Sequence, residues 1–180
     1  MAGAPMEDTF RSEKWLLHVD GSTTIQGSGA YIVITLSQGE DLEFPVKFGF
    51  EASNNEAEYE VLVLGMKMAP KAGTRHLMAY SDSQLIVKQV EGAYEAKEDN
   101  MIQYLQQIEE PRIRFKSFQL VQIAREENVK ADCLSKLTSA LEGCKTRHIT
   151  IQHLPKPRVA LSIQVISPIE DWRTHVIRWL

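Results

Sequence analysis

The feature that most constrains the fold is a change of hydrophobic period at Ser53. Before this residue come three short strand-like runs, Trp15–Asp20, Ala30–Leu36 and Leu42–Phe50. After it, apolar residues recur at helical spacing, at Ala57, Val61, Leu64 and Met68. The three runs predict an antiparallel meander, and Pro45 inside the third indicates an edge strand or a bulge. The helix should end at Pro70 and Gly73 and should cover one face of the sheet.

The remainder of the chain alternates between strand-like and helical segments. His76–Ser81 predicts a fourth strand, and a helix starting at Asp82-Ser83 should follow it through Gln89. A further helix from Glu98 or Asp99 should end at Ile108, before Pro111. Phe115–Ala124 and Asn128–Leu141 then predict a fifth strand and a last helix. This order, βββαβαβα with an extra helix, predicts an α/β fold with a five-stranded mixed sheet flanked by helices.

Composition sets the limits of the domain and the class of protein. Of the 180 residues 43% are hydrophobic, which supports one packed core, and a net charge of −4 argues against tight non-specific DNA binding. We expect a flexible leader at 1–14, one domain at 15–141 and a tail at 142–180, read as a linker with an extended piece at 159–166. The two cysteines form no disulfide framework, and we expect an intracellular protein without a membrane span.

Four acidic residues lie near the ends of separate predicted elements. Asp20 is predicted to end the first strand and Asp82 the fourth, Glu58 lies about one turn into the long helix, and Asp132 lies near the start of the last one. Taken singly, each has an ordinary explanation, such as a turn residue, a helix cap or a solvated charge. If the first and fourth strands are neighbours, however, the acids meet at one edge of the sheet. Such a group needs a counter-charge, and two divalent cations would suit phosphodiester cleavage.

Four motifs carry a family resemblance over residues 15–141. VDGS, SNNEAEYEVL, YSDSQLIV and REENVKADCLSKL, in this order, resemble a type 1 ribonuclease H domain. The resemblance is strongest to the ribonuclease H region of plant gypsy-type LTR retrotransposon polyproteins, and the tail resembles the start of the connection to integrase. It implies the ribonuclease H-like fold and cleavage of the RNA strand of RNA–DNA hybrids. It also implies two Mg²⁺ ions, with Mn²⁺ as an alternative.

The resemblance also implies a role for each matched residue. Asp20 would bridge both metals, Asp132 would hold the metal of the attacking water, and Glu58 and Asp82 would hold the leaving-group metal. Contacts with the minor groove of the hybrid are implied for Asn54, Asn55 and Gln84. A place beside the RNA strand is implied for Gly21 and Ser22, and a place near the scissile phosphate for Asn128.

Two departures from the family pattern bear on substrate handling. The loop before the last helix has no histidine, and Arg125 is the residue there that could contact phosphate. The stretch 90–100, where some members carry a basic helix, has four acidic residues against one lysine, so the grip on substrate should be weak. A neighbouring reverse transcriptase or integrase domain in a polyprotein could supply that grip, and the chain itself is expected to be a monomer. The alternative function is a non-catalytic nucleic-acid-binding or interaction module of the same fold.

Overall fold

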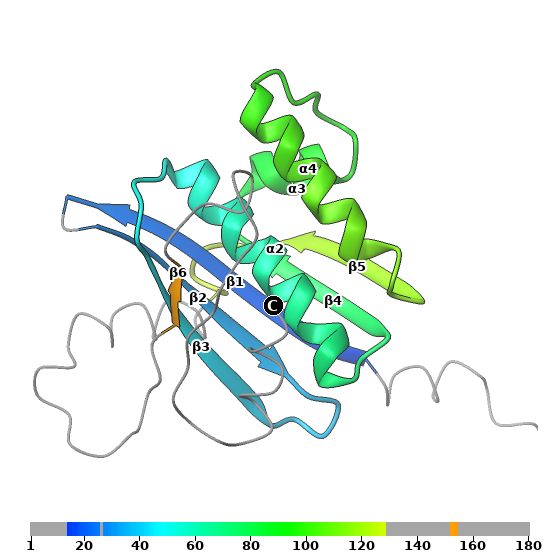
Figure 1. Ribbon diagram of the computed structural model, residues 1–180. Coiled ribbons are helices and arrows are strands. Elements are labelled where there is room, and N and C mark those ends of the chain that lie inside the picture. Colours follow the sequence, from blue (N-terminus) through cyan, green and yellow to red (C-terminus); the bar gives the residue numbers. More distant parts are fainter. Residues whose placement is uncertain (1–13, 26, 129–151, 155–180) are drawn as a thin grey trace, which may run out of the picture.

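The computed structural model describes residues 14–25, 27–128 and 152–154. The order of elements is three strands, a long helix, a strand, two helices and two further strands (Figure 1). Their bounds are β1 Lys14–Thr24, β2 Gly27–Thr35, β3 Asp41–Phe48, α2 Asn54–Ala72, β4 His76–Ser81, α3 Gln84–Val90, α4 Asp99–Arg112, β5 Ser117–Gln122 and β6 Gln152–Leu154. The predicted last helix and most of the tail lie outside the described residues.

The strands form a mixed sheet in the order β5-β4-β1-β2-β3-β6. β1, β2 and β3 pair antiparallel, which confirms the predicted meander. β4 pairs parallel with β1 and β5 parallel with β4, so the first and fourth strands are neighbours as the acidic pattern required. The long crossover through α2 makes the parallel β1–β4 pairing possible, since parallel strands cannot be joined by a tight turn.

The helix α2 lies across one face of this sheet (Figure 1). Its start is strongly specified, because Ser53 and Glu56 form a capping box in which each side chain accepts a hydrogen bond from the other residue's backbone N–H. Most of the helix is buried, and Gly65 allows close packing on β1, since an added Cβ there would lie 2.8 Å from the Leu17 side chain. The burial of α2 therefore fixes its distance from β1.

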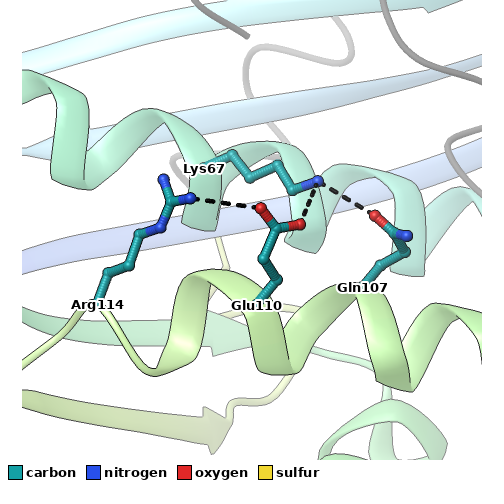
Figure 2. Close-up of polar contacts among 4 residues, drawn as sticks. All are labelled: Lys67, Gln107, Glu110 and Arg114. Atoms are coloured by element: carbon teal, nitrogen blue, oxygen red, sulfur yellow. Dashed lines mark hydrogen bonds and ion pairs between the residues drawn. The ribbon is translucent and has the colours of Figure 1, made fainter.

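The helix α4 packs on α2 through aromatic and polar side chains. The rings of Tyr59 and Tyr104 stack with centroids 5.3 Å apart, and the Tyr104 hydroxyl donates to Glu60 Oε1 at 2.6 Å. At the surface, Figure 2 shows Lys67 Nζ reaching Glu110 Oε2 at 3.5 Å and Gln107 Oε1 at 3.1 Å. These contacts hold α2 from the side away from the sheet.

Several local predictions need correction. Asp20 does not end the first strand, because β1 continues through it to Thr24 and pairs with β2 over that length. Pro70 lies inside α2, which ends before Gly73, and Pro111 lies inside α4. A proline there removes one helical hydrogen bond and crowds the carbonyl four residues before it, and the packing of α2 and α4 outweighs this cost in the last turn of each helix. The sheet also gains β6, a strand in the tail that the hydrophobic pattern did not indicate.

Within the described residues, no helix combines the length and hydrophobicity needed to cross a bilayer.

Candidate functional site

The candidate site lies where β4 ends beside β1. The β1–β4 pairing runs from Lys14 opposite His76 to His18 opposite Tyr80, and β4 stops at Ser81. Among the described residues, the strand neighbour of β1 from Val19 onward is β2, with Asp20 opposite Tyr31. Asp82 follows directly after β4. The two aspartates therefore meet at the point where the sheet loses one of its strands.

Glu58 reaches the same point from α2 because Gly21 lets the helix come unusually close to β1. The Gly21 N–H donates to Glu58 Oε1 at 3.1 Å. A Cβ on Gly21 would lie 2.5 Å from the Ala57 carbonyl carbon and 2.6 Å from the Glu58 nitrogen. Both distances are too short for a non-bonded contact of a Cβ atom. Glycine at this position is thus a steric requirement of the site, whereas the sequence pattern alone pointed to a turn.

The three carboxylates form a compact ligand set. One oxygen each from Asp20, Glu58 and Asp82 can be chosen so that all lie within 4.8 Å of one another. Asp20 and Glu58 are buried and Asp82 is partly exposed, so the cluster opens to solvent on the Asp82 side. Hard divalent cations prefer such oxygen ligands, and the donor set fits Mg²⁺ or Mn²⁺.

The electrostatics of Glu58 support the same interpretation. Burial, followed by the charges of Asp82 and Asp20, raises the pKa of Glu58 well above its ordinary value. The Gly21 N–H and the Ser81 hydroxyl act in the opposite direction but do not offset this. Glu58 Oε2 is buried and makes no hydrogen bond within normal geometric limits. A raised pKa of this origin favours the uptake of a proton or a cation by the cluster.

Arg125 is the cationic residue of the predicted site, and it lies beside the acidic cluster. Its Nε lies 3.8 Å from Asp82 Oδ2, and its side chain is 76% exposed. An ion pair this open to water contributes little to stability. The pair with Asp82 therefore does little to hold the Arg125 side chain in place.

Asn128 occupies the place that β4 leaves beside β1. Its Nδ2 donates to the Val19 carbonyl oxygen at 3.1 Å, and the side chain is almost completely buried. The bond satisfies a β1 carbonyl immediately before Asp20, at the point where β4 is no longer alongside. The sequence pattern gave no indication of this structural contact.

The predicted minor-groove residues stand at the starts of two helices. Asn54 and Asn55 begin α2, Gln84 begins α3, and all three side chains are exposed. Asn54 Oδ1 accepts a hydrogen bond from the Thr23 hydroxyl, which orients its amide. Ser22 is partly exposed next to Gly21 on β1. Thr23 was missing from the predicted set, although its place in the strand after VDGS could have indicated it.

Asp132, the fourth predicted carboxylate, lies outside the described residues, and its place in the cluster stays a prediction.

Residues 18–138 match the protein family described as reverse transcriptase-like. The chain belongs to this family. Among curated proteins, it is 29% identical over 84 residues to ribonuclease HI of Halobacterium salinarum, a match covering 47% of this chain and 42% of that protein. The match thus spans less than half of that relative.

Solved structures show that this reverse transcriptase-like protein is also similar to known proteins in its fold. RNase H1 from Halobacterium salinarum superposes with a TM-score of 0.60 at 22% identity, covering 71% of this chain and 98% of that one. LC11-RNase H1, solved in complex with an RNA/DNA hybrid, gives a TM-score of 0.58 at 26% identity, covering 71% and 99%. The mixed sheet with its helices is therefore a ribonuclease H fold, as the sequence predicted.

Proposed function

We propose that this protein is an endoribonuclease that hydrolyses the RNA strand of RNA–DNA hybrids with the help of two divalent metal ions. The observation that carries the proposal is the cluster of Asp20, Glu58 and Asp82 at the end of β4. Their convergence from three elements, together with the raised pKa of Glu58, is what a cation site requires. Mg²⁺ is the proposed ion and Mn²⁺ a substitute, because both prefer carboxylate oxygens.

Each carboxylate has a proposed task. Asp20 would help hold both ions, Glu58 and Asp82 would hold the ion on the leaving-group side, and Asp132 would hold the ion on the side of the attacking water. When bound, two such ions supply the positive charge that activates a water and stabilises the leaving oxygen. Gly21 holds one oxygen of Glu58 through its N–H, so that Glu58 Oε2 is left to act as a ligand. The burial of Asp20 and Glu58 limits access of water and strengthens every charge interaction there.

The choice of a hybrid substrate is supported by the exposed amides around the cluster. The side chains of Asn54, Asn55 and Gln84 can both donate and accept hydrogen bonds, which suits 2′-hydroxyls and base edges in a minor groove. The structure of LC11-RNase H1 with an RNA/DNA hybrid supports the same class of substrate. Gly21 and Ser22 would lie along the RNA strand. We place Arg125 and Asn128 near the scissile phosphate, Arg125 in direct contact and Asn128 through its support of β1.

The test uses a labelled RNA–DNA hybrid with Mg²⁺ or Mn²⁺. We expect metal-dependent cleavage by the parent protein and no cleavage by Asp82→Asn. Asp99→Asn is the matched control, since Asp99 is an exposed acid on α4 outside the cluster, and it should cleave like the parent. A correctly folded parent that binds the hybrid without cleaving it would instead support a non-catalytic binding module. Equal cleavage of double-stranded RNA or DNA would refute the proposed substrate.

We also propose that the chain derives from a plant gypsy-type LTR retroelement and acts as a monomer, with a reverse transcriptase or integrase domain as its partner in a parent polyprotein. The four motifs and the acidic 90–100 stretch support this, because a domain with a weak grip depends on a neighbour to hold the hybrid. Adding a purified reverse transcriptase domain of such an element should raise the cleavage rate at low enzyme concentration. No change in rate would count against the partnership.

A further inference from the structure

The sheet carries a feature that the proposed function does not use. β6, Gln152–Leu154, pairs parallel with the outer edge of β3, at the opposite side of the sheet from β5 (Figure 1). The pairs are Val46 with Gln152, Lys47 with His153 and Phe48 with Leu154. Two strands, β2 and β3, separate β6 from β1 and its acidic cluster.

Pro45 determines which backbone groups of β3 face this edge. Pro45 lies opposite Tyr31 in the antiparallel β2–β3 pairing and has no N–H to give to β2. Proline is accepted within a strand when its nitrogen faces away from the neighbouring strand. Successive residues of a strand alternate in direction, so the N–H and C=O groups of Lys47 face outward like those of Pro45, as do those of Glu43.

The register then predicts which groups of β6 bind. In a parallel pair, one residue bonds to the two residues flanking its partner on the opposite strand. Lys47 therefore donates to the Gln152 carbonyl and accepts from the Leu154 N–H, while the Gln152 N–H donates to the Pro45 carbonyl. The His153 N–H faces away from β3. Pro45 itself offers this edge an acceptor but no donor.

We propose that the outer edge of β3 over Val46–Phe48 is a strand-docking surface, which takes an extended peptide segment in parallel, and that the chain's own Gln152–Leu154 is the segment that occupies it. Unpaired strand edges are templates for pairing with other chains, and a segment of the same chain closes this one. An extended segment of another protein would reach this edge only by displacing Gln152–Leu154.

The first test measures amide hydrogen exchange by NMR in the full-length chain. The double variant Gln152→Pro/Leu154→Pro removes both donors to β3, and the Lys47 amide should then exchange roughly tenfold faster. His153→Pro is the matched control, because it puts the same residue type in the same strand but removes an outward N–H, and Lys47 should stay protected. The Glu43 amide, beyond the reach of β6, should be unchanged in both. Equal Lys47 exchange in parent and double variant would overturn the proposal.

The second test supplies the segment in trans. Because a tethered segment acts at an effective concentration in the millimolar range, a synthetic peptide of residues 148–158 is added at several millimolar to the double variant. It should restore protection at Lys47, whereas the same peptide with proline at both positions should not. Failure of the unmodified peptide to protect Lys47 would reject a docking surface. Hybrid cleavage should be the same in all these variants, so the outcome does not depend on the proposed activity.

Discussion

Replacing Gly21 by alanine should displace α2 from β1 and with it the Glu58 carboxylate. An added Cβ would lie 2.5 Å from the Ala57 carbonyl carbon, 2.6 Å from the Glu58 nitrogen and 2.7 Å from the Ala57 oxygen. All three are backbone atoms of a buried helix, so no side chain can rotate out of the way. Gly21 is not among the glycines with positive φ, and the cost comes from this close contact alone.

The size of the effect follows from the distances. Relief to an ordinary contact of about 3.5 Å requires α2 and β1 to separate locally by roughly 1 Å, and overpacking of this kind costs about 1–3 kcal/mol. A misplacement of about 1 Å in a catalytic group can cost around 10²-fold in rate. We therefore expect Gly21→Ala to unfold at lower urea concentration, to bind Mg²⁺ more weakly and to cleave the hybrid about a hundredfold more slowly.

The matched control is Gly65→Ala, at the same helix–strand interface. There the added Cβ would meet the ends of the flexible Leu17 side chain, at 2.8 and 2.9 Å. We expect some loss of stability, but the cleavage rate and Mg²⁺ affinity of folded Gly65→Ala should stay close to those of the parent. Urea unfolding, calorimetric Mg²⁺ titration and single-turnover cleavage would be measured on both variants. Wild-type stability and Mg²⁺ affinity in Gly21→Ala would refute the steric argument.

Three further predictions concern the acidic cluster and its surroundings. Because the pKa of Glu58 is raised in the folded chain, folding takes up a proton and metal-free stability falls as pH rises above the ordinary glutamate value. Glu58→Gln should therefore match the parent near pH 4 and exceed it at pH 7.5 in urea unfolding with EDTA, and a pH-independent difference would contradict this. Arg125→Ala should leave stability unchanged, since the pair with Asp82 is exposed, but should slow multiple-turnover cleavage; unchanged single- and multiple-turnover rates would remove its proposed role. Asn128→Leu leaves the Val19 carbonyl without its donor and should cost about 1–3 kcal/mol in thermal unfolding, whereas a neutral result would show that water replaces the amide.

Much of the fold could be predicted because its signals are local. The strand-like runs before Ser53 became β1 to β3, and the helical spacing after it became α2 with a capping box at its start. The prediction of β5 also held, with somewhat narrower bounds at Ser117–Gln122. Proline was the least reliable local signal. Pro70 and Pro111 both lie inside helices, because the packing of α2 and α4 outweighs the local cost of each proline.

The site was predicted as a set of residue types, and the described part of it came together as expected. Asp20, Glu58 and Asp82 converge, although Asp20 does so from within β1 and not from its end. The contacts that hold these carboxylates in place could not be predicted. The contact of Gly21 with α2 and the bond from Asn128 to Val19 join residues 37 and 109 positions apart, and no local pattern reports such distances.

By itself, the sequence determined the order of strands and helices and the identity of the acids, because period, capping and charge depend on residues that are neighbours in the chain. Only the tertiary structure decided that the pairing of β4 with β1 ends at His18, two residues before Asp20. It also decided that a glycine brings α2 within reach, and that three tail residues close the edge of β3. These features depend on backbone approach between distant segments, which is set by packing and not by the residue types alone.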